Sequence, residues 1–247
     1  MDLGLQGRTA LVCGASSGLG LASAEALAAE GANVTMLARR RDELERQADR
    51  IGALAVRGDV TLPQDTERAV AKTLEAFGSL DILVWNAGGP VPGRGTDVTP
   101  DSLEQAVDLM LYPLVRLVGA ALPSLEHSGA GRIVGITSLA AKEPTAHLAL
   151  SNTLRPAVHG YLKTLADELG PRGITVNCVA PGRIATARLE QLYPGGPTDD
   201  QLAQIPLRRW GEPRELGDVV CFLASERARY VSGQTIVVDG GLQRALW

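Results

Sequence analysis

The sequence is poor in cysteine and has no concentration of charge of one sign. Its 247 residues include three cysteines, Cys13, Cys178 and Cys221, without the CxxC spacing of many metal and redox sites. Each lies in an apolar segment, so we expect reduced thiols in the core of a cytoplasmic protein, and no metal site. The formal net charge is −4, and the basic residues are spread along the chain. This distribution excludes the concentrated positive surface with which proteins bind nucleic acid.

Long hydrophobic runs and a targeting leader are also lacking. A helix that spans a membrane needs about 18 or more consecutive apolar residues, and no such run occurs. Residues 1–12 carry no basic leader or cleavage signal and lead directly into a strand-like segment. We therefore expect a cytoplasmic protein that has no membrane partner.

What the chain does have is an alternation of short apolar runs with amphipathic stretches. This alternation is typical of a parallel sheet covered by helices on both faces. We predict an α/β fold with a doubly wound parallel sheet of seven strands, formed as a single domain over residues 1–247. The predicted strands are 9–13, 33–38, 53–57, 80–85, 131–137, 174–180 and 235–238, and the predicted helices lie near 18–30, 41–51, 64–77, 101–127, 153–169 and 213–224.

One region, residues 183–207, departs from this regular pattern. Pro194-Gly195-Gly196-Pro197 interrupts a weak helical periodicity there. Long insertions of this kind in compact domains often cover a substrate. We therefore predict that 183–207 is a substrate-loop insertion, with a plain surface loop as the alternative.

A glycine-rich turn directly follows the first predicted strand and opens the first predicted helix. Glycines permit a tight turn and a close approach of the backbone, while the free N–H groups at the helix start point toward a pyrophosphate. This order of strand, turn and helix predicts a Rossmann-type dinucleotide site. The turn reads Cys13-Gly14-Ala15-Ser16-Ser17-Gly18-Leu19-Gly20.

The end of the second predicted strand indicates which dinucleotide binds. Proteins that prefer NAD place a carboxylate there to accept a hydrogen bond from the ribose 2′-hydroxyl. This chain has Ala38 followed by Arg39, Arg40 and Arg41, with no acid before Asp42. A guanidinium group matches the 2′-phosphate of NADP in charge and shape. The sequence therefore favours NADP(H) over NAD(H), with Arg39 and Arg40 at the phosphate.

The spacing GxxxGxG of the turn, in place of GxGxxG, resembles that of the short-chain dehydrogenase/reductase family, although Cys13 stands where the family has a threonine. Overall the sequence looks most like the β-ketoacyl-acyl-carrier-protein reductases, in particular a divergent subgroup that lacks the full catalytic set. Further motifs extend the resemblance over nearly the whole chain: Gly58-Asp59-Val60, Asn86-Ala87-Gly88, Asn177 with Pro181-Gly182, Ile184-Ala185-Thr186 and Val238-Asp239-Gly240-Gly241.

The resemblance implies cofactor contacts along the chain. Asp59 and Val60 would flank the adenine, and Ile184 and Thr186 would hold the nicotinamide amide. It also implies a homo-oligomer, a dimer or a tetramer, paired through the fourth and fifth helices. The full set of expected cofactor residues is Gly14, Ser16, Ser17, Gly18, Leu19, Gly20, Arg39, Arg40, Asp59, Val60, Asn86, Ala87, Gly88, Arg155, Pro181, Gly182, Ile184 and Thr186.

The catalytic positions depart from the family pattern of an Asn, a Ser, and a Tyr followed four positions later by a Lys. Counting within matched segments keeps Ser138 as the family serine, but it places Ser151 at the tyrosine and Arg155 at the lysine. Met110 falls where the asparagine belongs. A serine hydroxyl is a far poorer acid than a phenol, and methionine cannot relay a proton. Pro156 disfavours helical dihedrals at the residue before it and could shift both positions.

Other residues could replace the missing proton donor. His147 lies in the loop that borders the substrate in the resembled family, and histidine is a common proton donor in enzymes, although a loop histidine is usually only exposed. Tyr112 lies near Met110, although core packing is its more ordinary role. His127 and His159 are expected on the surface or on a helix face.

Three functions remain open. The first is an NADP(H)-dependent oxidoreductase acting on a carbonyl or alcohol substrate, a small molecule or an acyl thioester, through Ser138, Ser151 and Arg155. The second is a non-catalytic NADP-binding or sensing protein derived from that family. The third is the chemistry of halohydrin dehalogenases, which resemble the family and have an arginine at the lysine position. Those enzymes, however, retain the tyrosine and rebuild the nucleotide loop.

Overall fold

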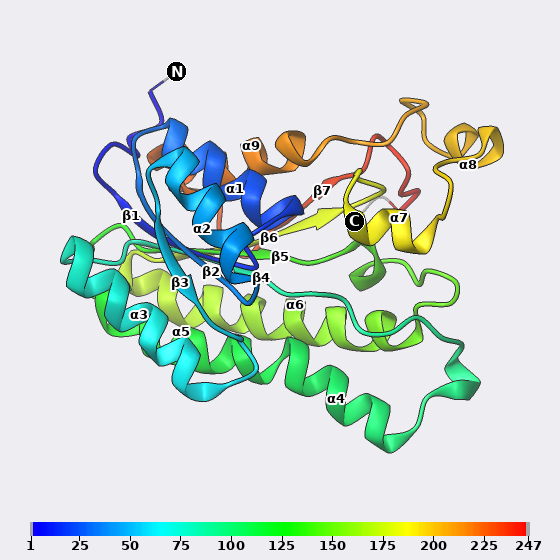
Figure 1. Ribbon diagram of the computed structural model, residues 1–247, viewed down its shortest axis with the longest axis horizontal. Coiled ribbons are helices and arrows are strands. Elements are labelled where there is room, and N and C mark those ends of the chain that lie inside the picture. The colour runs from blue at the N-terminus through cyan, green and yellow to red at the C-terminus, as the bar shows by residue number, and fades with distance from the viewer. Residues whose placement is uncertain (1, 246–247) are drawn as a thin grey trace.

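The computed structural model describes residues 2–245 and contains one parallel sheet. Its seven strands follow the order β3-β2-β1-β4-β5-β6-β7, as a Rossmann-type doubly wound sheet requires (Figure 1). The strands are β1 (Thr9–Cys13), β2 (Asn33–Ala38), β3 (Leu54–Arg57), β4 (Ile82–Asn86), β5 (Arg132–Ile136), β6 (Thr175–Pro181) and β7 (Thr235–Val238). They agree with the predicted strands to within one or two residues at each end.

Helices cover both faces of the sheet because its strands are apolar on both sides. Along β1, Ala10 and Val12 pack with helices α1 and α9, whereas Leu11 and Cys13 face α3, α5 and α6. Figure 1 shows these two layers above and below the sheet. The helices are α1 (Gly18–Ala29), α2 (Arg41–Ile51), α3 (Pro63–Phe77), α4 (Pro100–Met110), α5 (Tyr112–His127), α6 (Ala149–Leu169), α7 (Ala187–Leu192), α8 (Asp199–Ala203) and α9 (Pro213–Ala224).

The single helix predicted near 101–127 is wrong, because two helices occupy this stretch. The chain departs from ideal helical geometry at Leu111 (φ −104°, ψ −54°), and α5 then begins with Pro113 in its first turn. Proline lacks the N–H that would continue the earlier helix but fits the start of a new one. By length and apolar composition Pro100–His127 could cross a membrane. Its residues Leu114 and Leu117, however, are fully buried against the sheet.

Helix α6 starts earlier than the prediction of 153–169 and continues through Pro156. Proline has no backbone N–H to donate to the carbonyl oxygen one turn earlier in the helix. Because Pro156 is exposed, water can donate to that oxygen instead. The opposite side of the helix carries a buried stripe that includes Leu154 and Val158. Ser151 and Arg155 therefore keep the helical spacing on which their assignment depended.

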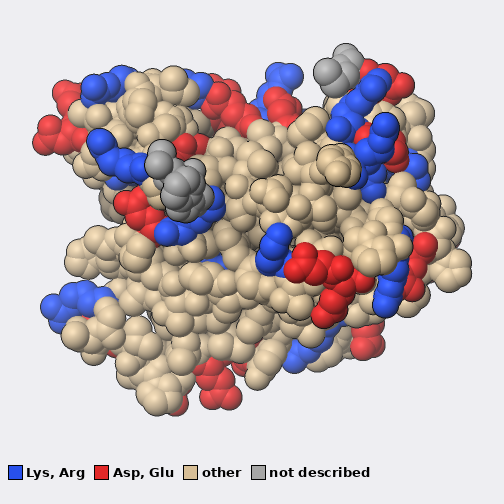
Figure 2. All heavy atoms as spheres, turned by 180° about the vertical axis from the view of Figure 1, so that it is seen from behind, with Lys and Arg blue, Asp and Glu red and all other residues tan. Residues whose placement is uncertain are grey.

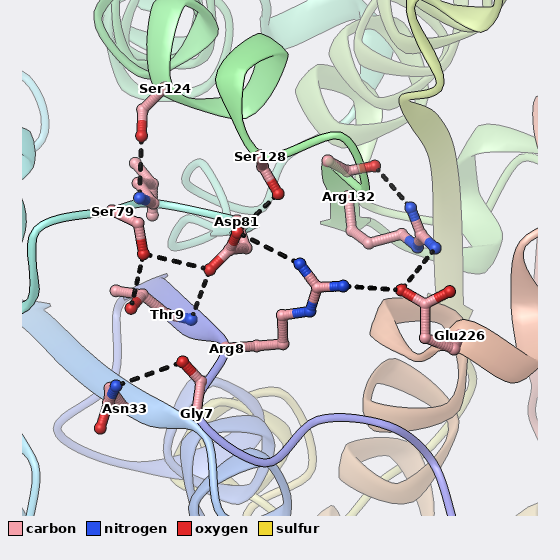
Figure 3. A network of polar contacts seen from close by, with 12 residues as sticks. Gly7, Arg8, Thr9, Asn33, Ser79, Asp81, Ser124, Ser128, Arg132 and Glu226 are labelled. Atoms are coloured by element: carbon pink, nitrogen blue, oxygen red, sulfur yellow. Dashed lines mark hydrogen bonds and ion pairs between the residues drawn. The ribbon is translucent and has the colours of Figure 1, made fainter.

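A polar network joins the amino ends of the strands, on the edge opposite to the start of α1. Asp81 accepts hydrogen bonds from the Thr9 backbone N–H at 2.8 Å and from the Ser128 hydroxyl at 2.5 Å (Figure 3). Arg8 lies 3.6 Å from Asp81 and 3.1 Å from Glu226. These contacts connect the starts of β1 and β4 to the end of α5 and to the segment after α9.

The three cysteines are free thiols in buried positions, as expected. On the face shown in Figure 2, Lys and Arg alternate with Asp and Glu among the described residues. Segment 183–207 is less irregular than the sequence indicated, because it contains the short helices α7 and α8. In Figure 1 these two helices project beyond the carboxyl ends of the strands.

Candidate functional site

The carboxyl ends of the central strands open into a cleft of about 810 Å³. It lies where the order of the strands reverses between β1 and β4, the position at which sheets of this kind bind ligands. With one exception, Gly20, the structure brings every site residue expected from the sequence to this cleft. The lining residues include Gly14, Ser16, Ser17, Gly18, Leu19, Arg39, Arg40, Asp59, Val60, Asn86, Ala87, Gly88, Ser138, Ser151, Arg155, Pro181, Gly182, Ile184 and Thr186.

The glycines of the turn allow the backbone to fold tightly beneath the cleft. Gly14 has φ +61° and Gly18 has φ +58°, a region that favours glycine. A Cβ on Gly20 would lie 2.4 Å from the Gly14 carbonyl oxygen, so Gly20 serves the packing of turn against helix and does not line the cleft. Asn86 Nδ2 donates to the Cys13 carbonyl oxygen at 3.3 Å, which ties the end of β4 to the turn.

Two arginines border the end of the cleft next to β2. Arg40 Nη2 donates to Ser17 Oγ at 2.7 Å and to Ser16 Oγ at 3.3 Å, so its guanidinium group lies against the glycine-rich turn. Arg39 Nη1 lies 3.7 Å from Asp59 Oδ2, and its side chain is 73% exposed. Arg40 is thus the better positioned of the two for a phosphate near the start of α1.

At the other end of the cleft, β5 and α6 provide the residues at the catalytic positions. Ser138 directly follows Thr137 at the end of β5, and its Oγ accepts a hydrogen bond from the Ala140 N–H at 3.1 Å. Ser151 lines the cleft and is 8% exposed. Met110 does not line the cleft, since it packs with Leu150 in a small apolar cluster. Methionine has no proton to pass on, so Met110 cannot take part in a proton relay.

Arg155 is a buried cation in the wall of the cleft. It is 6% exposed, and Nη1 donates to the Ile136 carbonyl oxygen at 3.3 Å, while Nε has no partner among the described residues. Burial, together with the charge of Arg188, lowers the pKa of Arg155 to about 10. Arg188 comes from α7 and also lines the cleft, a contribution that the sequence analysis did not identify. The only signal for it was its place in segment 183–207.

The alternative proton donors lie outside the cleft. His147 is exposed, with φ +59°, and Tyr112 is 49% exposed with Arg116 stacked 5.7 Å from its ring centre. Neither residue lines the cleft. The expectation that Tyr112 packs in the core is wrong, because the break at Leu111 turns the first residue of α5 outward. His127 is exposed, as expected.

His159 is a residue whose place near the cleft the sequence analysis missed. It is half-buried, and its Nε2 lies 2.7 Å from the hydroxyl of Thr137, a lining residue of the cleft. Nδ1 lies 3.5 Å from the Thr235 hydroxyl. Burial, followed by the charges of Arg155 and Lys142, lowers the pKa of His159 to about 4. The available signal was its spacing of one helical turn from Arg155 on the same face of α6.

This depressed pKa makes stability depend on pH. The unfolded chain takes up the His159 proton near pH 6.5 and the folded chain only near pH 4, so stability falls as the pH falls through this window. One pKa unit corresponds to about 1.4 kcal/mol, and partial exposure reduces the effect, so we expect a loss of about 2 kcal/mol. Urea unfolding of the wild type and of His159→Gln at several pH values would measure it. Parallel pH curves for the two proteins would contradict the prediction.

Comparison with known proteins agrees with the geometry of the cleft. A family model described as Enoyl-(Acyl carrier protein) reductase matches residues 14–243. The chain is 36% identical over 244 residues to dehydrogenase/reductase SDR family member 4 of Oryctolagus cuniculus, covering 96% of this chain and 94% of that protein. It is also 36% identical over 255 residues to the 3-oxoacyl-[acyl-carrier-protein] reductase of Vibrio cholerae, covering 97% and 99% of the two chains.

A solved structure supports the same relationship. L-Sorbose reductase from Gluconobacter frateurii, solved with NADPH and L-sorbose, superposes with a TM-score of 0.91. The sequence identity is 32%, and the match covers 100% of both chains. Full-length matches of this kind include the sheet, the glycine-rich turn and segment 183–207 together. The chain therefore belongs to the short-chain dehydrogenase/reductase family of oxidoreductases.

Proposed function

We propose that this protein is an NADP(H)-dependent oxidoreductase that acts on a carbonyl or alcohol substrate. The observation that carries the proposal is the single cleft, which joins the glycine-rich turn and Arg40 at one end to Ser138 and Arg155 at the other. Relatives whose names include an acyl-carrier-protein reductase and a structure with bound NADPH support the same reading. The substrate is a small molecule or an acyl thioester, and segment 183–207 shapes its pocket.

The cleft fits NADP(H) at both ends. At one end Gly18 begins α1 and lines the cleft, and a Cβ there would lie 3.4 Å from the Thr186 side chain, so glycine leaves this space open. The free N–H groups of a helix start suit a pyrophosphate. Arg40 and Arg39 would hold the 2′-phosphate. Asp59 and Val60 would flank the adenine. Asn86, Ala87 and Gly88 would line the ribose side, and Pro181, Gly182, Ile184 and Thr186 would border the nicotinamide.

The residues at the catalytic end can orient a carbonyl and stabilise developing charge. NADPH, when bound, supplies the hydride. The hydroxyls of Ser138 and Ser151 would donate hydrogen bonds to the substrate oxygen, and Arg155 would stabilise its negative charge. A positioned general acid contributes roughly 10²–10⁴-fold to a rate, and its absence slows the reaction without abolishing it. Correct placement of the reactants contributes more, on the order of 7–11 kcal/mol.

A second candidate function is a non-catalytic NADP-binding or sensing protein. It is favoured by the chemistry at the catalytic end, where buried Met110 does not line the cleft and Ser151 stands at the position that the family resemblance gives to a phenol. Both functions need the same cofactor end of the cleft. They differ only in whether hydride transfer follows binding.

One experiment separates the two. Purified protein is titrated with NADPH and with NADH by fluorescence, and NADPH oxidation is then screened with acetoacetyl thioesters, quinones and diketones. The enzyme is supported by turnover that falls about 100-fold in Ser138→Ala, the size expected for removal of one donor to an oxyanion. NADPH binding without turnover on these substrates would favour the sensor. Halide release from a halohydrin without NADPH binding would indicate the dehalogenase chemistry.

Reversal of charge at Arg40 should change the preference between the two cofactors. We expect Arg40→Asp to weaken NADPH binding by about 30-fold, because the variant loses a guanidinium group at the phosphate and places a carboxylate there. NADH binding should weaken by much less. Arg41→Asp is the matched control, because Arg41 pairs with Glu45 at 3.2 Å on the surface of α2 and does not line the cleft. Equal losses of NADPH affinity in the two variants would refute the role of Arg40.

We also infer that the protein assembles as a dimer or tetramer through the helices predicted at 101–127 and 153–169, which the structure forms as α4, α5 and α6. Leu103, Tyr112 and Val115 are large apolar residues on these helices and are 37%, 49% and 42% exposed. Burial of such residues between subunits is favourable. Light scattering coupled to size-exclusion chromatography would measure the oligomeric state, and Val115→Glu should shift it toward the monomer.

A further inference from the structure

Two arginines at the catalytic end of the cleft lack a carboxylate partner. The ion pairs of residues 2–245 include neither Arg155 nor Arg188. Both residues line the cleft, and the positive charge of Arg188 adds to burial in lowering the pKa of Arg155. Among the described residues, no carboxylate contributes to the lowered pKa of Arg155 or of the neighbouring His159, and the charges that act on His159 are those of Arg155 and Lys142. The corner therefore carries an uncompensated positive charge.

Burial makes this charge costly for Arg155. Removal of a guanidinium group from water is strongly unfavourable unless an anion or several hydrogen bonds compensate it. Arg155 has one hydrogen bond, to the Ile136 carbonyl oxygen at 3.3 Å, and its buried Nε has none. Ribose hydroxyls of a cofactor would accept hydrogen bonds but would leave the charge in place. An anion would accept the hydrogen bonds and would also compensate the positive charge.

Arg188 is held in position to provide the second half of an anion site. Its Nη2 donates to the Pro90 carbonyl oxygen at 2.8 Å, so the side chain crosses from α7 to the loop after β4. A Cβ on Gly89 would lie 3.2 Å from Nη2, and the absence of that side chain leaves room for the guanidinium group. This contact holds the guanidinium group of Arg188, from segment 183–207, beside the catalytic end of the cleft.

We propose that Arg155 and Arg188 bind a carboxylate of the substrate, so that the substrate is a short oxo acid or the corresponding hydroxy acid. This inference rests on the proposed function for the hydride step. The phosphates of the cofactor are accounted for at the start of α1 and at Arg40, so the anion at this end belongs to the second ligand. A guanidinium group forms two parallel hydrogen bonds with a carboxylate.

The same arrangement addresses the missing proton donor. Hydride adds to the carbonyl carbon, the electron pair of the C=O bond moves to oxygen, and a proton from water reaches that oxygen through the hydroxyl of Ser138 or Ser151. The products are the hydroxy acid and NADP⁺. The two guanidinium groups carry one more positive charge than the bound carboxylate compensates, and this excess charge stabilises the negative charge on the oxygen while the proton arrives. A carboxylate held by Arg188 would place the carbonyl beside these serines.

The test compares an acid with its uncharged ester. Acetoacetate and methyl acetoacetate are titrated calorimetrically into the wild type, with and without saturating NADP⁺, and both are assayed for NADPH oxidation. We expect acetoacetate to bind at least about 10-fold more tightly than the ester, as buried charge-assisted pairs imply. Arg188→Gln should remove that preference, and Arg188→Lys should retain part of it. Arg214→Gln is the control, since exposed Arg214 on α9 pairs only weakly with Asp218, at 3.8 Å.

The outcomes distinguish the inference from the function on which it rests. Equal affinity of the wild type for acetoacetate and for its ester would overturn the carboxylate site. An Arg188→Gln variant that unfolds at the wild-type temperature and still prefers acetoacetate to the ester would overturn it as well. Chloride that competes with acetoacetate at equal concentration would also overturn it, in favour of a simple halide site. Failure of the wild type to bind NADPH would refute the proposed function, whereas acetoacetate binding without cofactor would still support the anion site.

Discussion

Restoring a phenol and an amine at the catalytic end should raise the turnover number for NADPH-dependent carbonyl reduction by roughly 10²–10⁴-fold. The variant is Ser151→Tyr combined with Arg155→Lys. Both positions lie one helical turn apart on α6 and line the cleft, so a phenol at 151 would project into it beside the amine. A nearby cation lowers the pKa of a phenol and makes it a competent acid near neutral pH. Steady-state kinetics on the best substrate of the carbonyl screen would measure the gain.

The matched control separates acid chemistry from a change of shape. Ser151→Phe with Arg155→Lys fills the same space but has no hydroxyl, so it should show no gain. Addition of Met110→Asn tests whether the relay position contributes, although Met110 is buried outside the cleft. If the phenol variant bound NADPH and folded normally but turned over no faster than the phenylalanine variant, position 151 would not be the site of proton transfer.

Removal of the buried carboxylate at the amino edge of the sheet should destabilise the protein by about 3–5 kcal/mol, the cost of breaking a buried charged network. The variant is Asp81→Ala. Asp81 is 6% exposed and accepts from the Thr9 N–H at 2.8 Å, the Ser128 hydroxyl at 2.5 Å and the Ser79 hydroxyl at 3.3 Å. Its loss leaves the Thr9 N–H and the Ser128 hydroxyl without this acceptor, while Arg8 keeps only its pair with Glu226 (Figure 3). Chemical unfolding at neutral pH would measure the change.

NADPH binding should be unchanged in Asp81→Ala at temperatures where the variant is folded, because the network and the cleft lie at opposite ends of the strands. Asp218→Ala is the control, as its exposed pair with Arg214 should contribute less than about 1 kcal/mol. If the free energy of unfolding fell no further in Asp81→Ala than in Asp218→Ala, water would be shown to replace the contacts of the network.

The family relationship and the fold could be read from local features of the sequence. The turn from Cys13 to Gly20 follows an apolar run and opens a helix, and its residue types are constrained by the backbone that they form. The strand pattern is equally local, because each strand is apolar on both faces whatever its neighbour is. Confirmation of the seven-stranded sheet and of the family shows that these signals were sufficient.

Some features of the site depend on contacts between residues distant in sequence, and local sequence patterns could not predict them. Arg188 reaches Pro90, and His159 reaches Thr137 and Thr235, through paths that only the folded loops and the helix register determine. Residue type alone did not separate Arg188 from the other arginines of the chain or His159 from its two other histidines. Tyr112 was assigned to the core for the same reason, since the direction of its side chain depends on the break at Leu111.

The sequence by itself determined the layered α/β fold and the glycine-rich turn between β1 and α1, whereas the altered catalytic positions 110, 151 and 155 stay a prediction. These follow from periodicity, from turn chemistry and from counting along the chain. Only the tertiary structure decided that Gly20 packs under the turn, that Met110 faces away from the cleft, and that Arg155 and Arg188 share a corner without an acid. The physical reason is that burial and charge compensation are properties of what surrounds a side chain, and folding alone brings those surroundings together.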